Sequence, residues 1–298
     1  MKNSISIDHI KTKGIYMMYQ KMKFELKQHH ELPKGWWKYP NTLTGYRVHL
    51  SYKSSILSIF DSRHNEFWMI WSDIMPMFMF TYVYMWYIYS NIYKELNTFY
   101  KVTSSSIYIA VIVTRLCSSI YHIFNSMSLR SNNMLINFDL IGICQGALGS
   151  PWFMANLLQI DTFNNDYFLS YVSLLFTFYI ICVFIFGYLL ISTDKHEILD
   201  RLAINMLLFL ALIGNTPLII IGLNNRFPLM FRILCLTGTG SLGLGYIIYT
   251  KNIPEVFMRP GIADGKIWNS HVIWHTFVTI AQMCFICCIL APKNEYII

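Results

Sequence analysis

The chain has 298 residues, of which 55% are hydrophobic and 13% are charged, with a formal net charge of +7 and a mean hydropathy of +0.41. Soluble domains are about 25% charged, so these values exclude an ordinary soluble globular protein and are typical of a multi-pass integral membrane protein. All seven cysteines lie in apolar stretches, and we interpret them as small buried hydrophobic residues rather than as a disulfide framework.

The first 67 residues differ from the rest, because they contain eleven of the 23 lysines and arginines. They show no apolar region with a cleavage site, so we expect no signal peptide. Basic residues before a first span favour the cytosolic side, so we expect the N-terminus to be cytosolic and the C-terminus, after seven spans, to lie on the opposite side. Residues 48–61 have an amphipathic pattern and are predicted to form a short helix along the membrane surface.

Seven windows after this segment are apolar and about 20 residues long, which is the length of helix that crosses a bilayer. They cover approximately residues 68–91, 104–126, 137–159, 167–190, 200–222, 228–250 and 270–291. Backbone groups in lipid must be satisfied internally, so we predict an all-α fold. The chain would then consist of a basic cytosolic segment, 1–67, and a seven-helix transmembrane bundle, 68–298. Pro217 predicts a kink in the fifth span, and the glycines of "GTGSLGLG" predict close helix packing in the sixth.

Three of these spans place ionisable side chains at the same, cytosolic depth. The second ends near His122, the third begins near Asp139, and the seventh begins with His271 and His275. Histidines four residues apart lie on one helix face about 6 Å apart, so two imidazoles can converge on one metal ion. A third imidazole from a facing helix completes the ligand set of a catalytic zinc, which keeps one position open. Asp139 could orient a water molecule or accept its proton, and Ser118, one turn before His122, could hydrogen-bond to the water or the carboxylate.

Other interpretations of these residues stay open. Histidines at a membrane boundary can be solvated, and Asp139 can serve as the N-cap of the third helix. Arg115 either contacts a lipid headgroup or a carboxylate inside the bundle or, as we favour, pairs with backbone carbonyls or a structural acid. We interpret His64 as a packing or capping residue rather than as a ligand.

A set of motifs then follows in an order that characterises one membrane-protein family. The motifs are "LPKGWWKYPNTLTGYR", "SIFDSRHNEFWMIWSD", "SSIYHIF", "FDLIGICQGALGSPW" and "IPEVFMRPGIADGKIWNSHVIWH". They resemble those of the seven-helix family of progestin and adiponectin receptors and hemolysin III-type proteins, over most of the chain beyond residue 32.

The resemblance implies a zinc ion (Zn2+) as the cofactor, with His122, His271 and His275 as its ligands. It implies that Asp139 holds the water at the metal and that Ser118 completes the polar site. We expect membrane lipids and a hydrophobic lipid or steroid ligand as partners, and no nucleic acid.

The chain also departs from the family pattern. "FWM" follows "HNE", Asp73 stands where the family has histidine, and Val256 stands where it has arginine. Three functions remain: a zinc-dependent hydrolase of a lipid amide such as ceramide, which the resemblance favours; a seven-helix receptor or sensor with structural zinc; and a membrane-lytic or pore-forming protein of the hemolysin III type. A lipid-sized cavity that reaches the zinc would favour the hydrolase, and a cavity closed to lipid would favour the receptor.

Overall fold

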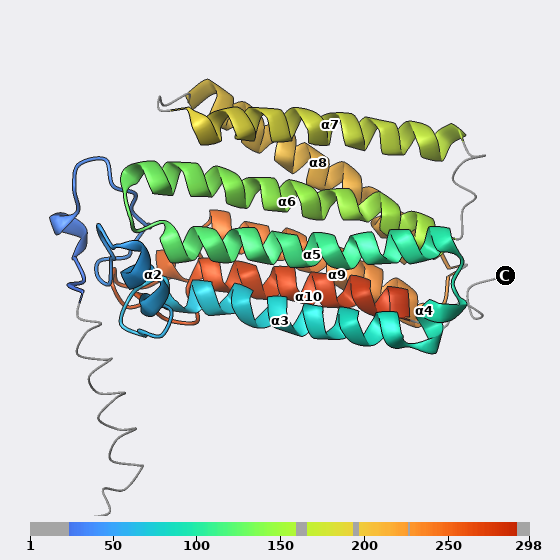
Figure 1. Ribbon diagram of the computed structural model, residues 1–298, viewed down its shortest axis with the longest axis horizontal. Helices are drawn as coiled ribbons and strands as arrows, with labels where there is room; N and C mark the ends of the chain where they lie inside the picture. Colours follow the sequence, from blue (N-terminus) through green and yellow to red (C-terminus); the bar gives the residue numbers. More distant parts are fainter. Residues whose placement is uncertain (1–23, 159–165, 193–196, 226, 291–298) are drawn as a thin grey trace, which may run out of the picture.

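The computed structural model of the protein is a bundle of long helices that run side by side (Figure 1). It describes residues 24–158, 166–192, 197–225 and 227–290, with all their side chains except those of 147–158, 166–169, 197–201 and 203. The first 23 residues of the basic segment and the end of the chain beyond residue 290 therefore lie outside the described ranges.

Seven helices of 21 to 30 residues overlap the seven predicted windows, so the all-α prediction is confirmed for the described residues. They are α3 (Phe67–Tyr89), α5 (Thr98–Phe124), α6 (Leu129–Leu158), α7 (Asp166–Ile191), α8 (Glu197–Leu223), α9 (Leu229–Thr250) and α10 (Ser270–Leu290). The shorter elements are η1 (His29–Glu31), α2 (Tyr52–Ser58), α4 (Asn91–Glu95) and η2 (Glu255–Phe257).

Capping residues rather than hydropathy decide where α5 and α6 begin. The side chain of Asn97 accepts a hydrogen bond from the backbone N–H of Tyr100 at 3.0 Å and starts α5. The hydroxyl of Ser128 accepts one from the N–H of Ser131 at 3.0 Å, so α6 begins eight residues before the predicted 137. Asp139 consequently lies well inside α6, and its interpretation as an N-cap is wrong.

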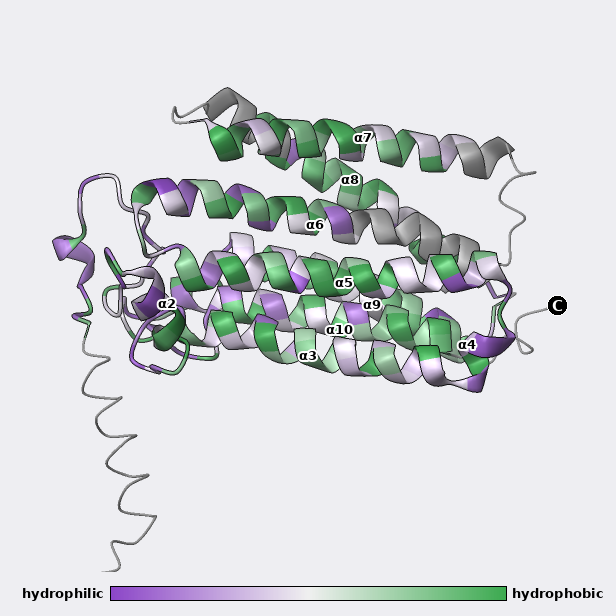
Figure 2. Ribbon diagram, viewed as in Figure 1, coloured by the Kyte–Doolittle hydropathy of each residue, from purple (hydrophilic) through white to green (hydrophobic). Residues whose placement is uncertain are grey.

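The exterior of the bundle is apolar, as a lipid-facing surface requires. Phe184 is 75% exposed and Leu212 is 64% exposed, and hydrophobic residues cover much of α7 and α8 (Figure 2). Five helices are long and apolar enough, within the described residues, to cross a membrane: α5, α7, α8, α9 and α10. The aromatic-rich α3 and the described part of α6 are not among them. The protein is thus an integral, multi-pass membrane protein.

Two glycines of α9 allow it to approach α10 closely. A Cβ atom on Gly238 would lie 2.5 Å from the ring of Phe285, and one on Gly245 would lie 2.7 Å from Cβ of Phe277. Neither position has room for a larger side chain, which confirms the predicted role of small residues here. The other two glycines in the motif, Gly240 and Gly243, have open space beside them and take no part in this packing.

The described N-terminal segment covers the end of the bundle where α3 begins (Figure 1). It is tied to the loop between α9 and α10, because Asp264 accepts hydrogen bonds from the N–H groups of Leu43 and Thr44 at 2.9 and 2.7 Å. The predicted surface helix within 48–61 is the seven-residue α2, whose Ser55 and Ser58 are buried. The segment therefore forms a polar cap over one end of the helices.

Candidate metal centre

Three imidazole rings meet inside this capped end of the bundle. His122 lies in the last turn of α5, and His271 and His275 lie in the first two turns of α10. Their possible ligand atoms all lie within 4.8 Å of one another, and the ring centroids are 4.8 to 5.3 Å apart. Because α5 ends and α10 begins at the same end of the bundle, the predicted common depth of these histidines is confirmed.

A carboxylate fixes the orientation of His122. Nδ1 of His122 lies 2.7 Å from Oε2 of Glu66, the residue that precedes α3, and both side chains are buried. A carboxylate can only accept here, so Nδ1 carries the proton and Nε2 has a free lone pair. Nε2 is buried and has no hydrogen-bond partner among the described residues. It is therefore free to bind a metal ion, in the carboxylate–histidine arrangement that supports many zinc ligands.

The other carboxylate oxygen of Glu66 is held by two further donors. Oε1 accepts from the hydroxyl of Tyr39 at 2.7 Å and from Nδ2 of Asn125 at 2.9 Å. Burial and the neighbouring Glu66 raise the pKa of Tyr39 well above its usual value, so its hydroxyl keeps its proton as a donor. Three hydrogen bonds thus fix the Glu66 carboxylate that orients His122.

Arg47 connects the N-terminal segment to the end of α5. It is 1% exposed, and it donates to the backbone oxygens of His122 and Ile123 and to the hydroxyl of Ser58. Burial lowers the pKa of Arg47 to about 10, so it remains a cation at neutral pH. Its charge balances Glu66 and stabilises the carbonyl end of α5, where a positive charge is favourable.

A second polar group orients His275. Its Nδ1 lies 2.8 Å from the hydroxyl of Ser72 and 3.3 Å from Oδ2 of Asp73, both on α3. Asp73 also forms a buried ion pair with Arg115 of α5, at 2.8 Å. The favoured interpretation of Arg115, pairing with a structural acid, is therefore confirmed.

Arg115 joins three helices beneath the histidines. Besides Asp73 of α3, its guanidinium donates to Oε1 of Gln282 at 2.9 Å and to the hydroxyl of Thr279 at 2.8 Å, both on α10. A planar guanidinium with five N–H donors suits such a junction, since four of its N–H groups find acceptors on the two neighbouring helices. The backbone that carries His275 is thereby fixed to α3 and α5.

Asp139 and Ser118 lie beside the histidines rather than among them. Ser118 and His122 both lie close enough to Asp139 to influence its carboxylate electrostatically. Asp139 is not one of the side chains whose ligand atoms cluster within 4.8 Å. Neither residue is therefore among the candidate metal ligands.

The donor set fits a metal ion such as zinc. Two nitrogens bound to one zinc ion at about 2.1 Å each lie at most about 4.2 Å apart. The possible ligand atoms of the three histidines lie within 4.8 Å of one another, so they need to move together by less than 1 Å. Nε2 of His122 and Nδ1 of His271 are buried and lack hydrogen-bond partners among the described groups. Buried polar atoms are normally paired, so two orphaned imidazole nitrogens in one cluster favour a bound cation.

His64 has the structural role that we expected. Its Nδ1 accepts from the N–H of Glu66 at 3.1 Å, and its Nε2 lies 2.8 Å from the carbonyl oxygen of Ser58. Burial, with a contribution from the charge of Arg47, lowers the pKa of His64 to about 3, so the ring is neutral. It thus holds the turn that presents Glu66 to His122.

A cavity of about 250 Å³ adjoins the centre on the side of the N-terminal cap. His271 lines it, together with Tyr39 of the N-terminal segment, Tyr249 of α9 and Glu255 of η2. Of the three histidines, His271 is consequently the one that lines the cavity at the capped end of the bundle.

Sequence reasoning missed several groups that shape this centre. Glu66 is part of the quoted "HNE" motif, which was the one available signal for it. Tyr39 and Arg47 come from irregular backbone, and nothing in their local sequence indicates a contact with α5. Asp73 stood out only as a departure from the family pattern.

Comparison with protein-family models relates this chain to one family. The model that describes haemolysin-III related proteins matches residues 61–286, which is most of the chain and includes all three histidines. The chain belongs to the haemolysin-III related family. Tyr39 and Arg47 precede the matched range, so part of the cap over this haemolysin-III related centre lies outside it. Among curated proteins, none matches the chain.

Proposed function

We propose that this haemolysin-III related protein is a zinc-dependent membrane hydrolase that acts on a lipid amide such as ceramide. The observation that carries the proposal is a group of three imidazoles, two of them with unpaired buried nitrogens. Near them lies the Asp139 carboxylate, which forms no ion pair within the described residues. Three neutral ligands and a neighbouring acid–base group are the components of a hydrolytic zinc site.

In this proposal His122, His271 and His275 hold the metal, and Glu66 and Ser72 keep the rings of His122 and His275 in the orientation that binding requires. A zinc ion there would supply Lewis acidity, which activates water and polarises a carbonyl near neutral pH. Asp139 would accept a proton from the attacking water and pass it to the leaving nitrogen. The C–N bond breaks as a C–O bond forms, so one amide and one water yield a carboxylic acid and an amine.

The lipid class follows from the surroundings of the centre. The helices around it expose apolar side chains that would face lipid, while the cavity beside His271 lies at the capped end, where a headgroup would reside. An amide at the junction between headgroup and acyl chain would therefore meet the histidines. The resemblance to progestin and adiponectin receptors supports the same class.

We extend the proposal to the topology. All seven long helices would cross the membrane, with the basic N-terminal segment in the cytosol and the C-terminus on the opposite side. Asp73 is 1% exposed and pairs with Arg115 inside the bundle, which explains how α3 would tolerate a carboxylate. Protease protection of tags at both ends tests this arrangement, and tags on the same side would exclude seven spans.

The decisive experiment measures fatty-acid release from a panel of ceramides by the purified protein, beside the zinc content of each variant. We expect about one zinc per chain in the wild type. The variants His122→Ala and His275→Ala should lose zinc and activity together. Asp139→Asn should keep most of the zinc and lose about a hundred- to ten-thousandfold in turnover. If zinc-loaded wild type releases no more fatty acid than metal-stripped protein, the hydrolase function is excluded.

One observation favours a receptor or sensor as the second candidate. The cavity of about 250 Å³ is smaller than the roughly 300–1,000 Å³ of sites that enclose drug-sized ligands, so it fits a headgroup rather than a whole lipid. A receptor would bind zinc and a lipid or steroid without turnover in the experiment above. Leakage of dye from lipid vesicles, measured in parallel, tests the lytic alternative.

A further inference from the structure

Glu255 stands out among the groups that line the cavity next to the histidines. It begins η2, between α9 and α10, and it is only 6% exposed. Its Oε1 accepts a hydrogen bond of 2.6 Å from the backbone N–H of Ser270, the first residue of α10. One oxygen of this carboxylate therefore anchors the helix that carries His271 and His275.

The second oxygen of the same carboxylate has no partner among the described residues. Oε2 of Glu255 is buried and has no hydrogen-bond partner among the described residues. Within that part of the chain, no lysine, arginine or histidine forms an ion pair with Glu255. A buried carboxylate is costly unless a cation or several donors compensate it. The missing partner is then a group that enters the cavity.

The walls of the cavity suit a positively charged partner. Tyr39 and Tyr249 line it, and their rings lie 6.0 and 5.0 Å from the ring of His271. Aromatic rings attract organic cations, most strongly where water is partly excluded. The next residue along the chain, Val256, carries no charge and is 54% exposed, so it does not compensate Glu255.

We propose that this cavity is an ammonium-binding subsite, in which Glu255 receives the protonated amine of an organic ligand between Tyr39 and Tyr249. The inference rests on the proposed function, because it names the product that the subsite accepts. Hydrolysis of a lipid amide gives a carboxylic acid and an amine, and transfer of one proton between them leaves a carboxylate and an ammonium. Glu255 binds that ammonium beside the histidines, and the acyl product departs from the other side of the cleaved bond.

The experiment measures binding directly, with zinc-loaded full-length protein in detergent micelles. The probes are a long-chain 2-amino-1,3-diol, its neutral analogue with hydroxyl in place of the amine, its N-acetyl derivative, and the short soluble amine ethanolamine. The wild type should bind the long-chain amine about ten- to a hundredfold more tightly than either neutral compound, as a charge-assisted hydrogen bond provides. Comparable tight binding of ethanolamine would identify free amines, rather than lipids, as the source of the ammonium.

Glu255→Gln tests the residue itself, because the amide oxygen can still accept from Ser270. The variant should keep its zinc and its affinity for the neutral diol while it loses the preference for the amine. Glu95→Gln, on the exposed helix α4, is the matched control and should keep the preference.

Two results overturn the subsite: equal binding of the amine and its neutral analogues by the wild type, or an unchanged preference in Glu255→Gln. The first needs no variant, so a misfolded Glu255→Gln leaves the proposal falsifiable. A clear amine preference without any hydrolysis would exclude the proposed function and retain the subsite. Hydrolysis without amine preference would exclude the subsite and retain the proposed function.

Discussion

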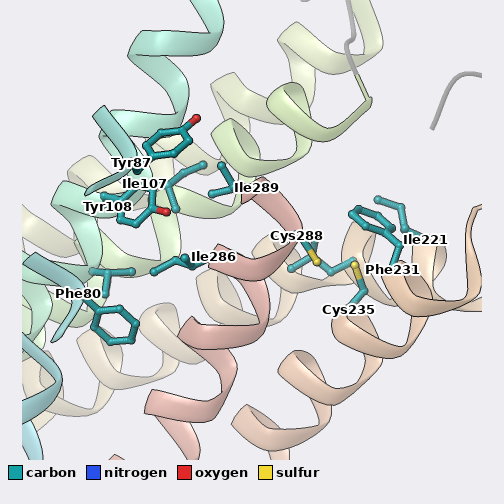
Figure 3. Close-up of a cluster of buried hydrophobic side chains, with 12 residues drawn as sticks. Phe80, Tyr87, Ile107, Tyr108, Ile221, Phe231, Cys235, Ile286, Cys288 and Ile289 are labelled. Carbon is teal, nitrogen blue, oxygen red and sulfur yellow. The ribbon is translucent and has the colours of Figure 1, made fainter. Parts of the chain in front are cut away.

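The helices α3, α5 and α10 have two very different ends. At the capped end they bring together two carboxylates, an arginine and three histidines, all in contact with one another or with backbone groups. At the other end the same helices contribute Phe80, Tyr108 and Ile286 to an apolar cluster (Figure 3). Ionisable groups inside a membrane are costly, and concentrating them at one end lets each charge find its partner.

Arg115 marks the boundary between the two ends. It is 2% exposed, its acceptors come from α3 and α10, and the apolar cluster begins on the same helix with Val111, one turn earlier. The difference between the ends indicates that polar interactions position the histidines, while apolar packing holds the helices together. The following substitutions separate these contributions.

Arg115→Met should have the largest effect on stability. It leaves the buried Asp73 carboxylate without its cation, which typically costs about 3–5 kcal/mol. Unfolding by denaturant in mixed micelles measures the loss. The double variant Asp73→Asn/Arg115→Met removes the stranded charge and should recover more than half of it. Equal instability of the single and double variants would mean that the ion pair is not what the arginine contributes.

Glu66→Gln should act on metal binding more than on folding. The amide cannot match the carboxylate as the acceptor for Nδ1 of His122, so we expect zinc affinity to fall about ten- to a hundredfold. Competition with a chromophoric chelator gives the affinity. Glu95→Gln serves as the control at the other end of the bundle. Wild-type affinity in Glu66→Gln would show that the orientation of His122 does not depend on this carboxylate.

The contrast between the two ends also separates what the sequence could predict from what it could not. Helices of bilayer length follow from local hydropathy, and the spacing of His271 and His275 follows from helix geometry. The pairing of Glu66 with His122 spans 56 positions, and it depends on how an irregular turn packs against α5. The start of α6 was misplaced for a related reason, because a single cap at Ser128 lies outside the apolar window.

We expect acid to destabilise the capped end first, because His64 becomes protonated. Its pKa in the folded protein is about 3, against an ordinary value of 6.5 for histidine. The stabilisation by the neutral ring is complete above pH 6.5 and is lost as the pH falls from 6.5 toward 3, because the unfolded chain binds the proton first. Between pH 7 and pH 5.5 the loss is about 1 kcal/mol.

The variant His64→Gln isolates this titration from those of other groups. The stability difference between wild type and variant should shrink by that amount over the same pH interval, as measured by unfolding in micelles. A difference that stays constant from pH 7 to pH 5.5 would assign the acid sensitivity to another group.

Tyr108→Phe should have the smallest effect, and in the opposite direction. Tyr108 is 0% exposed in the apolar cluster, and its hydroxyl has no hydrogen-bond partner among the described residues. Removing an unpaired buried hydroxyl relieves its desolvation cost, so the variant should be between unchanged and about 1 kcal/mol more stable. The same substitution at the capped end, Tyr39→Phe, removes the bond to Glu66 and should destabilise the protein. If Tyr108→Phe were the more damaging of the two, hydrogen bonding would also be essential at the apolar end, and the division between the two ends would be wrong.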